Sequence, residues 1–61
     1  MTELQITIMY LMKRAGIVAE CRETVMNYLK TEEQQQEMLS FLMENPTVSN
    51  REVAYKLVEI I

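Results

Sequence analysis

The sequence lacks histidine, aspartate and tryptophan, and it has one residue each of cysteine, glycine and proline. The single cysteine, Cys21, cannot form a disulfide within the chain, and with no histidine beside it a structural zinc site is not expected. Without a histidine to move protons, and without a glycine-rich phosphate loop, no pattern indicates catalysis. One glycine and one proline are too few for the turns of a β-sandwich or a small barrel. We therefore predict an all-α, non-enzymatic protein that needs no cofactor and no metal.

The chain is acidic, because it has six basic and nine acidic residues and therefore a net charge of −3. All nine acids are glutamate, which is a good helix former, whereas aspartate is a poor one. A nucleic-acid partner would need clustered basic side chains to replace the counterions on phosphate. The only adjacent basic pair is Lys13-Arg14. Nucleic acid is therefore not an expected partner.

No targeting or membrane segment is expected. The apolar run from Ile6 to Met12 lacks a basic stretch before it and a small-residue cleavage site after it. It is also shorter than the roughly 20 residues that span a bilayer. A lone thiol is typical of a reducing compartment. We therefore expect a cytoplasmic protein with no membrane partner.

The length of 61 residues predicts a single helical domain over residues 1–61. A chain of this size buries only about 60% of the surface that it exposes when unfolded, so its core is small. Hydrophobic residues make up 49% of the sequence, which is more than one small bundle hides easily. With disulfides and zinc excluded as stabilising links, we expect a homo-oligomer, with a dimer as the simplest form.

The second half of the chain predicts two helices, over 32–44 and 50–60, joined by a connection over 45–49 that contains Asn45-Pro46. Three sites have the spacing of a capping box, in which a hydroxyl and a Glu or Gln three residues later cap a helix start. They are Thr2 with Gln5, Thr31 with Gln34, and Ser49 with Glu52. The last helix has a broad apolar stripe formed by Val53, Ala54, Leu57, Val58 and Ile61.

The first half, residues 3 to 30, has apolar residues in alternating steps of four and three, with one gap at Arg22. This heptad pattern favours one long helix that packs along another. A hairpin of two shorter helices broken at Gly16 is the alternative, since a glycine inside a helix costs only about 1 kcal/mol. A strand over Leu4 to Met12, where apolar residues also alternate, is a further possibility.

The same pattern predicts an interface between copies. Met9 and Met12 lie off the heptad seam beside Ile6 and Tyr10, so the first helix is apolar around most of its circumference. A helix of that kind must be covered on more than one side. The candidate interface residues are Leu4, Ile8, Met9, Leu11, Met12, Ala15, Val18, Val25 and Leu29.

The segment 34–57 contains the run QEMLSFLMENP followed by SNREVAYKL. It resembles the first two helices of winged helix-turn-helix transcription regulators, in which an Asn-Pro turn leads to a Ser- or Thr-capped helix with a Glu-apolar-Ala step. In that family the two helices support a third, the recognition helix, which enters the major groove. The recognition helix and the wing lie outside the resemblance, so it implies the helix pair without implying DNA binding.

Taken together, the sequence predicts a small homo-oligomeric interaction or regulatory module, which associates with itself and docks another protein. The alternative is a reduced helix-turn-helix-like DNA-binding regulator of phage or mobile-element type. The sequence does not identify the partner or the pathway.

Overall fold

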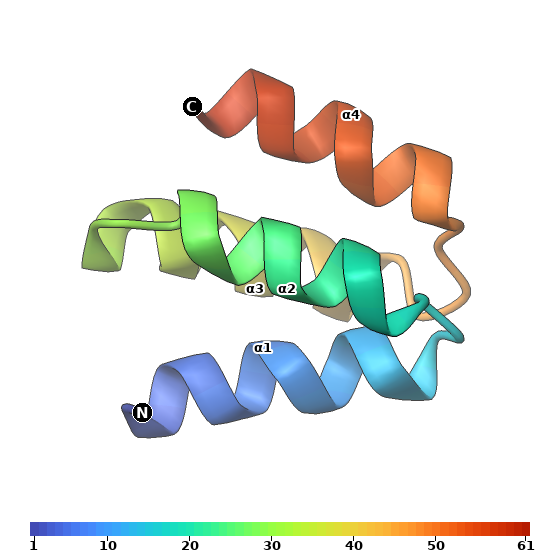
Figure 1. Cartoon of the computed structure of the whole chain (residues 1–61), viewed down its shortest axis with the longest axis horizontal. Coiled ribbons are helices and arrows are strands. Elements are labelled where there is room, and N and C mark those ends of the chain that lie inside the picture. Colours follow the sequence, from blue (N-terminus) through green and yellow to red (C-terminus); the bar gives the residue numbers. More distant parts are fainter.

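The four helices of the chain are connected by short turns, and there is no strand (Figure 1). The computed structural model describes all residues from 1 to 61. The all-α prediction is confirmed, and the ranges predicted for the last two helices agree with the structure. The helices are α1 (Glu3–Arg14), α2 (Ala19–Tyr28), α3 (Glu32–Glu44) and α4 (Asn50–Ile60).

The predicted long helix over residues 3 to 30 is wrong, because the chain breaks at Gly16 as in the hairpin alternative. Gly16 has a φ of +88°, and no other residue has a positive φ. Its N–H donates to the Lys13 carbonyl at 3.1 Å, and the N–H of Ile17 donates to the Met12 carbonyl at 3.0 Å. These two bonds form a Schellman motif, which ends a helix with glycine in the left-handed region.

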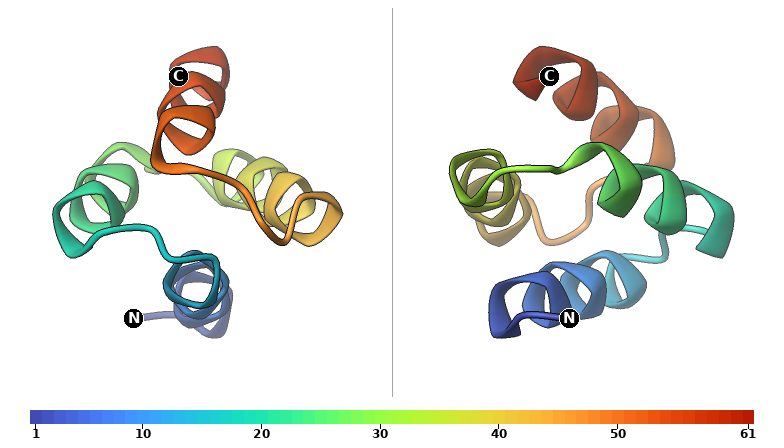
Figure 2. Two further views of the ribbon diagram at one scale, coloured as in Figure 1. Left: turned by 90° about the vertical axis from the view of Figure 1, so that its right-hand side faces the viewer. Right: turned by 60° about the vertical axis from the view of Figure 1, so that its left-hand side comes forward.

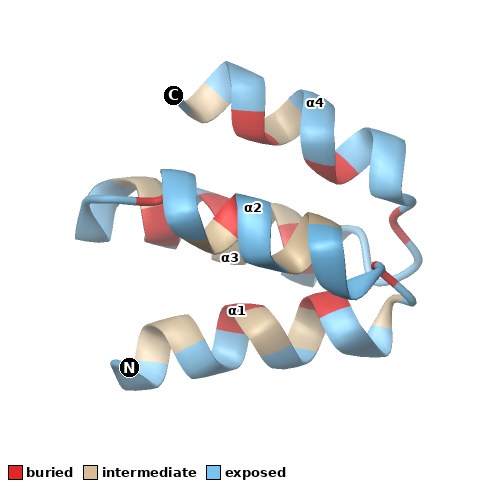
Figure 3. Cartoon of the chain, viewed as in Figure 1, coloured by how far each residue is buried: buried red, intermediate tan, exposed pale blue.

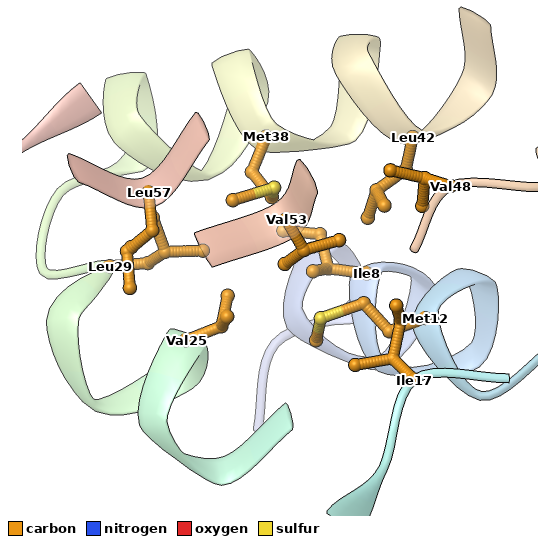
Figure 4. Close-up of a cluster of buried hydrophobic side chains, with 10 residues drawn as sticks. All are labelled: Ile8, Met12, Ile17, Val25, Leu29, Met38, Leu42, Val48, Val53 and Leu57. Carbon is orange, nitrogen blue, oxygen red and sulfur yellow. The ribbon is translucent and has the colours of Figure 1, made fainter. Parts of the chain in front are cut away.

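Burial explains why the break is stable. In a Schellman motif the residue after the glycine contacts the residue that accepts its bond. Here Ile17 and Met12 are both buried in the core, next to each other in Figure 4. Breaking at Gly16 also turns α2 back, so that Val25 and Leu29 reach the same core. The strand considered for Leu4 to Met12 is also absent, since those residues lie inside α1.

All three predicted capping boxes are present, at the first residues of α1, α3 and α4. In α4, the N–H of Glu52 donates to Ser49 Oγ at 3.2 Å, and the N–H of Ser49 donates to Glu52 Oε1 at 3.0 Å. Helix α2 has no cap of its own. The N–H of Val18 at its start donates instead to Oδ1 of Asn50, the first residue of α4, at 3.0 Å. The starts of α2 and α4 are therefore joined.

Helices α2 and α3 lie between α1 and α4, which occupy opposite sides of the molecule and whose backbones do not approach each other closely (Figures 1 and 2). The buried positions face the space enclosed by the four helices, and the exposed positions face outward (Figure 3). Figure 4 shows Val53 near the middle of this cluster. The core consists of Ile8, Met12, Ile17, Val25, Leu29, Met38, Leu42, Val48, Val53 and Leu57.

The cap of α4 gives the chain a measurable acid sensitivity. Hydrogen bonds from the backbone N–H and the hydroxyl of Ser49 hold the pKa of Glu52 below its ordinary value of 4.5. A lowered folded-state pKa stabilises the fold above the ordinary value, and this contribution is lost as the pH falls through the folded-state pKa. Glu52→Gln keeps an accepting oxygen, as Gln5 and Gln34 do in the other two boxes. We expect its melting temperature to fall less than that of the wild type between about pH 6 and pH 3, by no more than a few degrees.

The control is the same substitution in a Ser49→Ala background, which removes the hydroxyl and keeps the backbone N–H of residue 49 as a donor to residue 52. There, Glu52→Gln is expected to reduce the acid-dependent fall in melting temperature by a smaller amount than it does in the wild type. An equal effect in both backgrounds would show that the Ser49 hydroxyl does not contribute to the lowered pKa of Glu52. Thermal denaturation followed by far-ultraviolet circular dichroism measures all four chains.

Candidate interaction surface

The structure divides the nine predicted interface residues between the core and the surface. Ile8, Met12, Val25 and Leu29 are buried within one chain, so they form no part of a free surface. The heptad pattern arises because the two arms of the α1–α2 hairpin face one core. Leu4, Met9, Leu11 and Ala15 are half-buried against that core, and Val18 is exposed.

One apolar surface lies on the outer side of α1. Ile6 and Tyr10, one helical turn apart, are 55% and 59% exposed. Lys13 and Arg14 follow them in the last turn, and both are exposed. This α1 outer face is therefore a small apolar patch with two positive charges at one end. Neither Ile6 nor Tyr10 was among the nine candidates, although the sequence indicated that this side of α1 is apolar.

A second apolar surface lies on α4 and was missed as a separate feature. The sequence predicted one broad stripe on this helix, but the structure divides it. Val53 and Leu57 enter the core, and Ile60 packs against it. We call the exposed remainder the α4 outer face. It consists of Ala54, Tyr55, Val58 and Ile61.

The large hydrophobic side chains of the α4 outer face are highly exposed. Tyr55 is 68% exposed, Val58 is 71% exposed and Ile61 is 56% exposed. Ala54, Val58 and Ile61 recur in steps of four and three, which places them along one side of the helix. A helix that buries one apolar stripe and exposes another is not explained by its own core alone. The signal in the sequence was the width of the stripe, which exceeds what one neighbouring helix pair covers.

Lys56 fixes which flank of α4 faces α3. Its Nζ lies 3.6 Å from Glu37 Oε2 on α3 and 3.2 Å from Glu59 Oε1, and it lies 5.7 Å from the centre of the Phe41 ring. The hydrogen bond to Glu59 is the main cause that raises the pKa of Lys56, and the charges of Glu59 and Glu37 add to it. A raised pKa stabilises the fold below the ordinary value of 10.5, and this contribution is lost as the pH rises through the folded-state pKa. Glu37 and Phe41 belong to α3, so this flank of α4 is covered, whereas the residues of the α4 outer face are exposed.

The remaining polar features lie at helix starts or against the core. A polar depression of roughly 320 Å³ lies between the first turns of α1 and α3, and Leu4 is its only hydrophobic lining residue. Its two carboxylates, from Glu3 and Glu32, lie in the first helical turns, where negative charge stabilises a helix. Cys21 is half-buried against the core.

Two further properties of the chain concern metal ions and membranes. No group of three or more histidine, cysteine, aspartate or glutamate side chains gathers where it could hold a metal ion. None of the four helices combines the length and the apolar character that crossing a bilayer requires. The candidate functional features are therefore the α1 outer face and the α4 outer face. No protein-family model matches the chain, and no curated protein or solved structure is significantly similar to it.

Proposed function

We propose that this protein is a small non-enzymatic interaction module that associates with itself and docks another protein. One observation supports this proposal most directly. Two exposed apolar faces, on α1 and on α4, lie on opposite sides of the molecule and belong to helices whose backbones do not approach each other closely. A module with two separate faces can bind two different surfaces at the same time.

The residues of the two outer faces are not needed to bury the core of one chain. Their exposure therefore indicates a role in binding, not in folding. A compact monomer of 7.2 kDa is expected to expose about 4,100 Å². The chain exposes 4251 Å², so it is as compact as an ordinary monomer of its mass. The ten core residues are buried without help from a second chain. Association through the outer faces is therefore expected to be reversible, between copies that are already folded.

The experiment is sedimentation equilibrium of the wild-type chain from about 10 µM to 1 mM. We expect the weight-average mass to rise from that of a monomer towards that of a dimer across this range, with unchanged circular dichroism. Dimer formation without a change in helix content would support association of folded copies. A chain that stays monomeric at every concentration would contradict the self-association in this proposal.

A mobility-shift assay on mixed DNA at low salt is the control for the alternative, a reduced DNA-binding regulator. We expect no shift, because two of the six cations are held within the fold. Lys56 is bound to Glu37 and Glu59, and Arg22 Nη1 donates to the Ile17 carbonyl at 2.7 Å. Strong binding that weakens steeply with added salt would favour the alternative instead.

A further inference from the structure

We propose that the α4 outer face binds a second copy of this chain, with the two α4 helices antiparallel. The inference rests on the proposed function, because it names the partner of one of the two faces. A two-fold axis through the middle of the face would make the contact identical for both copies, which is the commonest symmetry of homodimers. Ala54, beside Tyr55 at the start of the face, has the small side chain that lets two helices approach closely.

The charges on either side of Tyr55 determine the direction of pairing. Arg51 is exposed one turn before Tyr55, and Glu59 is exposed one turn after it, where its Oε1 also accepts a hydrogen bond from Lys56 of the same chain. In an antiparallel pair, Arg51 of each copy lies opposite Glu59 of the other, so two ion pairs form. In a parallel pair, Arg51 would lie beside Arg51, and Glu59 beside Glu59. Like charges across an interface disfavour it, so the antiparallel arrangement is selected.

The α1 outer face is less suited to the same use. It offers only two large apolar side chains, Ile6 and Tyr10. Lys13 and Arg14 lie at one end, and Glu3 is the only acid at the other. An antiparallel pair of α1 helices would therefore leave one cation of each copy without a partner. The α1 outer face is better suited to a different protein that brings its own acidic groups.

The size of the α4 outer face predicts a weak dimer. A buried aromatic side chain contributes about 150–250 Å², so the exposed fractions of Tyr55, Val58 and Ile61 correspond to about 350 Å² per chain. A stable interface of standard size buries about 800 Å² on each partner. Even with Ala54 and the flanking charges, the contact lies at the lower end of specific interfaces. We therefore infer a dimer that forms at high concentration and dissociates on dilution.

Val58→Glu tests the apolar part of the contact in the full 61-residue chain. Because Val58 is 71% exposed, the variant should fold as the wild type does, which circular dichroism and melting temperature check. We expect the dimer dissociation constant to rise at least about tenfold, since a charge without a partner would enter the interface. The matched control is Tyr10→Glu, an apolar-to-acidic change on the α1 outer face. It should leave the dissociation constant within about twofold of the wild type.

Charge exchange tests the direction of pairing. Arg51→Glu and Glu59→Arg should each raise the dissociation constant about two- to tenfold, because each replaces two opposite-charge pairs with like-charge pairs. Combining both substitutions should bring the constant back towards the wild-type value. Glu59→Arg also removes the Lys56–Glu59 hydrogen bond and leaves Glu37 as the ion-pair partner of Lys56, so circular dichroism and melting temperature check the fold of these variants.

The outcomes separate this inference from the proposed function. Loss of the dimer in Val58→Glu, with recovery in the charge-exchanged double variant, would support the antiparallel α4 pair. A dimer that survives Val58→Glu and is lost in Tyr10→Glu would overturn the α4 assignment and leave the proposed self-association intact. Absence of recovery in the double variant would overturn the antiparallel direction. A wild-type chain that stays monomeric up to 1 mM would overturn both proposals.

Discussion

Replacing Ile8 with alanine is expected to lower the free energy of unfolding by about 2–5 kcal/mol, the usual cost of truncating a buried isoleucine. Ile8 is fully buried on α1 and belongs to the core cluster. A chain of this length typically has a total stability of about 3–9 kcal/mol. The substitution therefore removes a large part of the total and leaves a substantial unfolded fraction at 25 °C.

The matched control is Ile6→Ala, the same substitution two residues earlier in the same helix. Ile6 is 55% exposed, so its replacement should change the free energy of unfolding by less than about 0.5 kcal/mol. Urea denaturation of both variants at two protein concentrations gives the comparison. If Ile8 instead served an interface between copies, Ile8→Ala would be harmless at low concentration. Equal effects of the two variants would contradict the placement of Ile8 in the core.

Gly16→Ala is expected to cost about 1–2 kcal/mol. The φ of +88° at this residue is unfavourable for an L-amino acid. A Cβ atom built at this position meets no other atom within 4 Å, so the cost comes from the backbone conformation and not from a clash. The variant should unfold at a lower urea concentration than the wild type. Its helix content when folded should be unchanged.

D-alanine at residue 16, introduced by chemical synthesis, is the control that separates backbone conformation from loss of chain flexibility. It favours positive φ and has the same Cβ, so we expect a gain of about 0.4–1 kcal/mol over glycine. A rise in both stability and helix content with L-alanine would contradict the break at Gly16. It would indicate the continuous helix that the heptad pattern favours.

The parts of the fold that local chemistry controls could be predicted from the sequence. A capping box needs two residue types three positions apart, so Ser49 and Glu52 mark the start of α4 without knowledge of the rest of the chain. The residue before a proline disfavours helix, which places the end of α3 near Asn45. These signals gave the ranges of α3 and α4 directly.

The heptad pattern does not predict the break between α1 and α2, because it counts Gly16 as a residue inside a helix. The informative feature was the pair Gly16-Ile17, in which the isoleucine reaches back to the core beside Met12. That contact offsets the interruption of the helix, and it depends on tertiary packing that a heptad count does not include. The same steps of four and three suit a hairpin folded on one core, as Ile8 and Val25 show.

The burial of one glutamine among three consecutive ones is a second feature that could not be predicted from the sequence. The run Gln34-Gln35-Gln36 appears uniform, but the three side chains have different environments. Gln34 caps α3, whereas Gln35 is buried and its Nε2 donates to the Leu29 carbonyl at 3.1 Å. Gln36 is exposed. Which of three identical residues enters the core depends on the rotation of α3 against α2, and this rotation is set by long-range contacts.

The hydrogen bond from Val18 to Asn50 has a consequence for the order in which the chain becomes stable. It joins residues 32 positions apart in sequence, and it supplies α2 with the only side-chain acceptor at its start. Until α4 docks, the first turn of α2 depends on water for that bond, so the N-terminal hairpin is incomplete as a folding unit. Exchange of the Val18 amide hydrogen therefore reports on the attachment of the last helix.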